Sequence, residues 1–175
     1  MSATVAELDV LPPNRALQLL GDCCGSTRWI SAMVARRPFG SMERLLATAD
    51  EIWRSLGSDD WREAFSHHPR IGEQRGVRPQ SERGAAWAAG EQAGVGDARD
   101  DVRQALANAN REYERRFGYI YIVCASGRTA EELLATVTER LRNDLETELS
   151  VAAEEQRKIT RLRLEKLLGP KGDAA

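Results

Sequence analysis

The stretch LETELSVAAEEQRKITRLRLEKLL, residues 145–168, carries the strongest fold signal in this chain. Its residues at alternating spacings of four and three fall on one narrow stripe at about 100° per residue. The stripe consists of Leu145, Leu149, Ala152, Gln156, Ile159, Arg163 and Leu167. The pattern predicts a long C-terminal helix with two polar residues on its buried face. A buried guanidinium such as that of Arg163 needs an acidic partner or an anionic ligand.

Earlier segments also show apolar residues every three or four positions, which predicts helices over residues 14–20, 26–36, 42–56, 58–66, about 97–117 and 129–142. Ser26, Ser58 and Asp97 are placed to cap three of these helices, and Thr129 with Glu132 forms a capping-box pattern. The inward face of the helix after Asp97 is expected to carry Val102, Leu106, Ala109, Tyr113 and Phe117. Glycines and a proline interrupt residues 72–84, which we predict to form a loop.

Residues 119–125, Tyr-Ile-Tyr-Ile-Val-Cys-Ala, are β-branched and aromatic, so their propensity favours a strand. No other segment offers a convincing partner strand, and we expect a buried extended or irregular segment between helices. The predicted fold is therefore all-α, a single-domain multi-helix bundle over residues 1–168 with a flexible tail over 169–175.

The composition is that of an ordinary globular protein. Of 175 residues, 42% are hydrophobic and 30% charged, and 25 Lys and Arg against 27 Asp and Glu give a net charge of −2. This balance argues against nucleic acid and anionic membranes as partners.

No apolar run would span a bilayer and the N-terminus has no secretory pattern, so we expect a cytoplasmic protein. Three cysteines without CxxC spacing predict neither a disulfide nor a metal site.

The two histidines are adjacent, in Ser66-His67-His68-Pro69-Arg70. Because a residue before proline disfavours the helical conformation, the helix should end at His68 and leave its imidazole beside the predicted loop. Histidine has an ordinary pKa near neutral pH, which suits a general acid or base. The alternative is a histidine that only interacts with the negative end of its helix.

A second candidate lies in Trp87-Ala88-Ala89-Gly90-Glu91-Gln92, where Ala88, Glu91 and Gln92 share one helical face. A small residue beside an acid and an amide could bind a small ring that carries amide groups, or the face could be a solvated helix end.

Cys124 is more simply a small core residue than a nucleophile, because its neighbours are apolar.

Five ordered segments resemble the OHCU (2-oxo-4-hydroxy-4-carboxy-5-ureidoimidazoline) decarboxylase family. They are residues 23–29 (CCGSTRW), 68–72 (HPRIG), 91–94 (EQAG), 117–125 (FGYIYIVCA) and 157–164 (RKITRLRL). The resemblance implies an all-α domain, commonly a homodimer, that uses no cofactor or metal and releases (S)-allantoin and carbon dioxide in urate breakdown.

The same resemblance implies site residues. His68 matches the catalytic general acid or base and Glu91 its acidic companion. The residues that match substrate-binding positions are Pro69, Ala88, Gln92, Tyr121, Ile122, Val123, Cys124, Ala125 and Arg163. Main-chain N–H and C=O groups of residues 121–125 are expected to bind ring amides.

One residue departs from the family pattern, because Ala88 stands where the family usually has serine. A lost hydroxyl removes one ligand hydrogen bond, roughly 0.5–1.5 kcal/mol. Two other functions therefore stay open: a non-catalytic helical interaction module, and a related enzyme acting on another ureido or imidazole acid.

Overall fold

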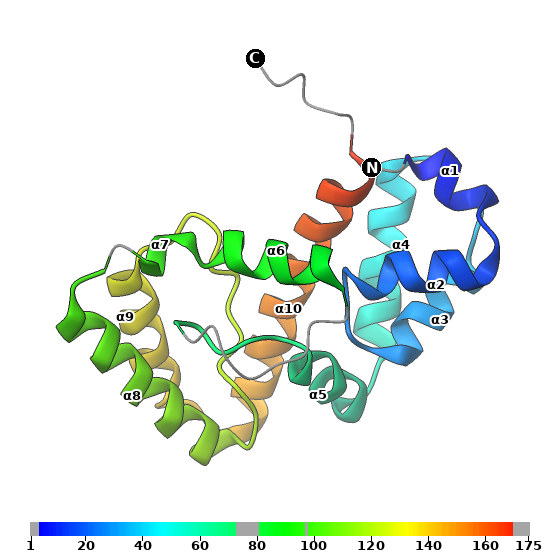
Figure 1. Cartoon of the computed structure of the whole chain (residues 1–175). Coiled ribbons are helices and arrows are strands. Elements are labelled where there is room, and N and C mark those ends of the chain that lie inside the picture. The colour runs from blue at the N-terminus through cyan, green and yellow to red at the C-terminus, as the bar shows by residue number, and fades with distance from the viewer. Residues whose placement is uncertain (1–3, 73–80, 97, 170–175) are drawn as a thin grey trace. The chain divides into compact units, whose positions relative to one another are not determined.

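The computed structural model describes residues 4–72, 81–96 and 98–169, and within them it is all-helical, without a β-strand (Figure 1). The helices are α1 Val5–Val10, α2 Pro13–Gly21, α3 Thr27–Ala35, α4 Met42–Ser55, α5 Ser58–Ser66, α6 Glu82–Glu91, α7 Ala93–Gly96, α8 Asp100–Phe117, α9 Ala130–Arg140 and α10 Leu145–Leu168. The all-α class and the long C-terminal helix are confirmed.

The chain divides into two compact units. The first lies within Met1–Glu63 and Arg157–Ala175, and the second within Ala64–Gln156. The division falls inside α5 and inside α10, so each of these helices contributes residues to both units.

In the first unit, α3 packs against α2 and α4. Their apolar faces bury Leu20, Trp29, Met33 and Leu45, and the Trp29 indole N–H donates to the Ala49 carbonyl at 3.1 Å. Side chains also fasten α1 to this unit. Arg37 donates to the carbonyls of Leu8 and Leu11, at the C-terminal end of α1, at 2.7 Å each.

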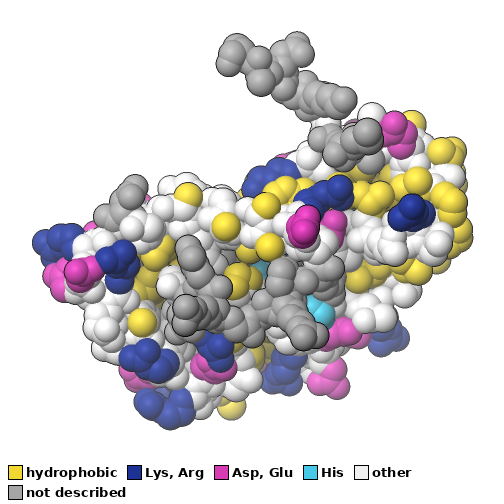
Figure 2. Space-filling model, viewed as in Figure 1, with side chains coloured by type: hydrophobic (Ala, Val, Ile, Leu, Met, Phe, Trp, Pro, Cys, Tyr) yellow, Lys and Arg dark blue, Asp and Glu magenta, His cyan; other side chains and the backbone are white. Residues whose placement is uncertain are grey.

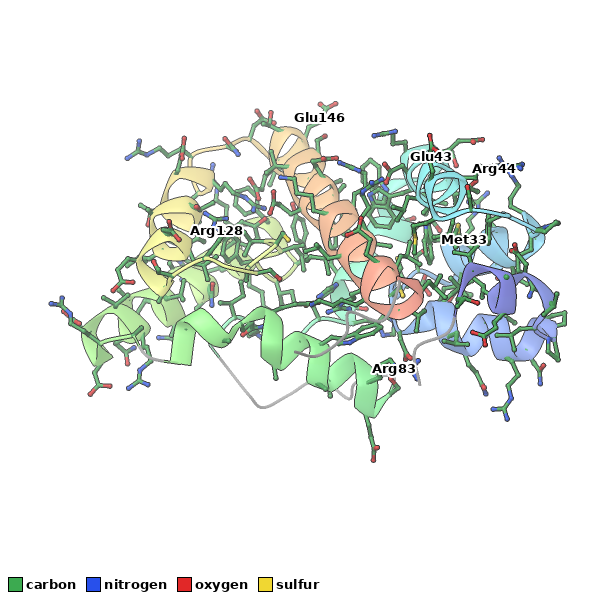
Figure 3. All side chains as sticks on the ribbon, turned by 90° about the horizontal axis from the view of Figure 1, so that it is seen from above. Met33, Glu43, Arg44, Arg83, Arg128 and Glu146 are labelled. Atoms are coloured by element: carbon green, nitrogen blue, oxygen red, sulfur yellow. The ribbon has the colours of Figure 1, made fainter. Side chains whose placement is uncertain are left out.

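In the second unit, α8 packs against α9 over a core that includes Leu106, Phe117, Leu133 and Val137. Arg128, in the loop before α9, donates to the Thr136 hydroxyl and so lies along that helix (Figure 3). Residues 120–125 form no helix or strand, as expected, and all but Ile120 and Cys124 are buried.

Several boundaries differ from the sequence prediction. α1 was not predicted; Thr4 and Glu7 stabilise this short helix through a reciprocal capping box. The predicted loop 72–84 is wrong at its end, because Ser81 caps α6, which begins at Glu82. Residues 73–80 and the predicted cap Asp97 lie outside the described residues, and Arg99 occupies the N-cap position of α8.

Two inward-facing assignments also need correction. On α8, Ala109 is only half-buried, and the buried position belongs to the neighbouring Asn110, whose side chain has a hydrogen-bond partner. On α10, Leu145 is 65% exposed because it opens the helix, whereas Ala152, Gln156, Ile159, Arg163 and Leu167 are buried as the stripe predicts. Ser26 does cap α3, and Thr129 with Glu132 does form the capping box of α9.

None of the helices in the described part of the chain is long and apolar enough to cross a membrane. Figure 2 shows basic and acidic side chains interspersed on the face that it presents. None of the three cysteines, all within the described residues, forms a disulfide, and Cys23 and Cys24 are buried.

Candidate active site

Hydrogen bonds fix the turn that follows α5 and carries His68. The His68 N–H donates to the Phe65 carbonyl at 3.1 Å, which closes the end of α5, and His68 itself is 8% exposed. Two residues further along the chain, Arg70 makes a two-pronged ion pair with Glu114 of α8, at 2.9 and 2.8 Å. Because paired, planar contacts of this kind constrain orientation, the turn is held against α8.

Asn110 and Gln92 hold the next residues of the same turn. The Asn110 amide donates to the Ile71 carbonyl at 2.9 Å, and the Gln92 side-chain oxygen accepts the Gly72 N–H at 3.0 Å. Gln92 is the C-cap of α6, one residue after Glu91. The Gly72–Gln92 hydrogen bond therefore joins the segment that carries His68 to the segment that carries Glu91.

The face of α6 that leads to this junction consists of small residues. Ala88 is 8% exposed, whereas Glu91 and Gln92 are half-buried at the helix end. Gly94 follows in α7, and a Cβ there would lie 2.2 Å from the Arg128 carbonyl oxygen. Only glycine fits this contact, so α7 approaches the chain that leaves residues 121–125 more closely than any side chain would permit.

Aromatic contacts place the start of the extended segment against the end of α5. The rings of Phe65 and Tyr119 lie 5.2 Å apart, and the rings of Tyr113 and Tyr121 lie 5.3 Å apart. The second unit thus gathers three of the predicted site segments, namely residues 68–72, 88–92 and 121–125.

The main chain of this segment is less open than the sequence predicts. The Ile122 carbonyl accepts from Arg140 Nη1 at 2.8 Å, and the Cys124 N–H donates to Glu155 Oε2 at 2.8 Å. The Ala125 carbonyl accepts from the Arg128 N–H at 3.0 Å. The Cys124 N–H is therefore already used within the protein, whereas the Ile122 and Ala125 carbonyls each keep a second lone pair that could accept from a ligand. Substrate binding by this main chain stays a prediction.

Arg140, which binds the Ile122 carbonyl, belongs to a buried cluster of charged groups. Arg140 is 6% exposed and donates to Glu148, which is fully buried and also accepts from the Tyr113 hydroxyl. Burial disfavours the Arg140 cation, but its hydrogen bond to Glu148 raises the pKa of the guanidinium above the ordinary value. Burial also raises the pKa of Tyr121, to about 12. Arg140 therefore stays charged and Tyr121 neutral at neutral pH.

Arg163 belongs to the first unit. It is 7% exposed and lies near Cys24, where its charge favours the thiolate. Burial nevertheless dominates and raises the pKa of the Cys24 thiol to about 11. The thiol is therefore protonated at neutral pH, and the role of Arg163 toward a substrate stays a prediction.

Sequence reasoning missed Asn110, Arg140 and Glu155. Arg140 carries a recognisable signal, because it continues the spacing of Leu133 and Val137 along α9 and is the polar residue on that stripe. Asn110 and Glu155 have no such signal, since each contacts a main-chain group 39 or 31 residues away in sequence.

Comparisons with known proteins cover most of the chain. The family model for OHCU decarboxylase matches residues 9–165. A solved structure of OHCU decarboxylase in the presence of (S)-allantoin is 35% identical in sequence and has a TM-score of 0.74. The match covers 87% of this chain and 99% of that chain.

Two curated relatives are similar in sequence. The uric acid degradation bifunctional protein TTL of Arabidopsis thaliana is 38% identical over 85% of this chain and 46% of its own length. The 2-oxo-4-hydroxy-4-carboxy-5-ureidoimidazoline decarboxylase of Amia calva is 33% identical over 79% of this chain and 78% of its own length. The chain spans less than half the length of this Arabidopsis relative and of two bifunctional uric acid degradation proteins from Bacillus.

Proposed function

Because this chain belongs to the OHCU decarboxylase family, we propose that it converts OHCU to (S)-allantoin and carbon dioxide in urate degradation. The observation that supports this most is the family match over residues 9–165, which includes every segment with a predicted site residue. Relatives whose names state this reaction or urate degradation support the same choice of substrate.

The chemistry of the substrate explains what the protein must supply. The carbon that loses carbon dioxide stands next to a ring C=N bond, which accepts the electron pair of the breaking C–C bond. The substrate thereby provides the electron sink that a cofactor provides in other decarboxylases. The protein must orient the ring, stabilise the enolate-like intermediate and deliver one proton to one face.

We assign proton delivery to His68 and the orientation of its imidazole to Glu91. His68 is buried on a turn that is held by the Arg70–Glu114 ion pair and by hydrogen bonds of Asn110 and Gln92 to Ile71 and Gly72. A ring on such a fixed turn can meet a substrate from one direction only, which one-sided protonation requires. A carboxylate beside the imidazole would stabilise its protonated form.

The test generates OHCU in situ from urate and follows the optical activity of the allantoin that forms. The wild type should give one enantiomer rapidly. His68→Asn and Glu91→Ala should leave a slow racemic background, with a loss of about 10²–10⁴-fold for the general acid.

His67→Asn is the matched control, because His67 is the adjacent histidine and is only half-buried. It should behave almost as the wild type. A fully active His68→Asn protein would refute the assignment of the acid, and a wild type at the background rate would favour the interaction module or an enzyme for another ureido acid.

A further inference from the structure

Two side chains outside the predicted site set the orientation of two consecutive peptide groups in the segment 121–125. Arg140 donates to the Ile122 carbonyl, and Glu155 accepts the Cys124 N–H, each at 2.8 Å. These two groups belong to the peptide planes immediately before and after Val123. Both planes are thus fixed from the side of α9 and α10.

Peptide geometry then determines where the Val123 groups point. In a planar trans peptide the C=O of one residue and the N–H of the next point in opposite directions. Among the described residues the only cis peptide bond is Arg37–Pro38, so both planes beside Val123 are trans. The Val123 N–H therefore points away from Arg140, and the Val123 C=O points away from Glu155.

Val123 presents a donor and an acceptor that the described protein does not use. Val123 is 5% exposed, and neither of its main-chain groups hydrogen-bonds to another residue in the described ranges. Buried main-chain groups in proteins are nearly always paired. A ring amide or ureide, which offers a C=O beside an N–H, would pair with both groups of Val123.

We propose that Glu155, together with Arg140, is a positioning residue that aims the Val123 N–H and C=O at the amide groups of the substrate. This inference rests on the proposed function. Glu155 acts through the Cys124 N–H, and its carboxylate takes no part in bond making or breaking. Its contribution is to binding and ring orientation.

The choice between the two residues for an experiment follows from burial. Arg140 shares the buried cluster with Glu148 and Tyr113, so its removal would disturb the fold. Glu155 is half-buried and can be replaced with less risk. Glu155→Met keeps the side-chain length without a strong acceptor, and Glu155→Gln keeps an acceptor oxygen without the charge.

The experiment measures KM and kcat on in situ OHCU, and (S)-allantoin affinity by calorimetry. Glu155→Met should raise KM and the (S)-allantoin Kd roughly three- to tenfold, as expected for one lost hydrogen bond, while kcat falls less. Glu155→Gln should stay within about twofold of the wild type in both. A purely structural role would lower the active fraction and leave KM unchanged.

Glu154→Met is the matched control, because Glu154 is the exposed neighbour on α10. It should change neither constant.

If Glu155→Met does not fold, Glu155→Asp takes its place, since the shorter side chain cannot reach the Cys124 N–H and should raise KM in the same way. An unchanged KM in the folded variant, or an equal defect in Glu155→Gln, would overturn the inference while wild-type turnover upholds the proposed function. A wild type without turnover would instead overturn the function.

Discussion

Each unit contains a carboxylate paired with arginine, one arginine in the second unit and three in the first, and the two clusters are built differently. In the second unit, Glu148 is fully buried and all its described partners are close: Arg140, Asn143 at 2.8 Å and the Tyr113 hydroxyl. In the first unit, Asp50 Oδ2 accepts from Arg157 at 2.8 Å and Arg161 at 3.0 Å, with Arg54 at 3.9 Å.

The two clusters differ in the ratio of positive to negative charges and in the exposure of their arginines to water. The Glu148 cluster pairs one acid with one base and fills the acid's remaining capacity with neutral donors, as a buried ion pair requires. The Asp50 cluster has several cations for one anion, and the Asp50 Oδ1 atom is buried with no hydrogen bond to a described residue. Arg54 is 65% and Arg161 34% exposed, so water shares in stabilising them. Breaking the buried pair should therefore cost more.

The strongest challenge to this comparison is Glu148→Gln. Because it leaves the Arg140 cation buried without an opposite charge, the free energy of unfolding should fall by about 3–5 kcal/mol. Urea unfolding followed by circular dichroism measures the loss. Glu146→Gln is the control, since Glu146 extends outward from the first turn of α10 (Figure 3) and should change stability by less than about 0.5 kcal/mol. A loss below about 1 kcal/mol for Glu148→Gln would mean that water reaches the pair.

Unfolding at alkaline pH compares two buried groups that are neutral at pH 7, Cys24 of the first unit and Tyr121 of the second. Burial raises the pKa of Cys24 from 9.0 to about 11, so folding favours the protonated thiol. The stabilisation is complete below pH 9 and disappears as the pH rises toward 11, a loss of up to about 2–3 kcal/mol. Tyr121, with its pKa raised from 10.0 to about 12, should add a later loss above pH 10.

Unfolding free energies from pH 8 to 11 measure this effect, with Cys24→Ala as the comparison. The variant should lose stability only in the later, tyrosine range. An identical pH dependence in both proteins would show that Cys24 does not control the first phase.

Asp50→Asn should have the smallest effect. Since Arg54 and Arg161 reach solvent, the loss of the charge should cost about 1–2 kcal/mol, and added salt should reduce the difference by screening the remaining cations. The same urea assay measures it, at low and high sodium chloride. A cost as large as that of Glu148→Gln would remove the distinction between the clusters.

Local patterns explain which parts of the fold the sequence predicts. Regular apolar spacing predicts α2–α5 and α8–α10, because each buries one face, and hydroxyl caps mark several of their starts. α1 is too short for a periodic signal, and Gly84 in the first turn of α6 disguises the start of that helix. Residues 120–125 have strand propensity, and only the absence of a partner indicates their irregular form.

For the candidate site, the sequence predicts the segments and not the contacts that fix them. His68, Glu91 and Gln92 are chemically conspicuous, so motif and residue type make them candidates. Asn110 and Glu155 look like ordinary polar residues of amphipathic helices. Their importance depends on carbonyl and N–H groups that tertiary packing brings to them.

Gly94 has a consequence for how this protein tolerates change. Its missing side chain sets the spacing between α7 and the Arg128 carbonyl, and Gly94 is not itself a predicted ligand contact. Surveys that vary only residues lining the reaction centre would overlook it. Libraries intended to alter substrate range should keep this glycine constant, because a single methyl group there would shift the backbone scaffold before any new specificity could be selected.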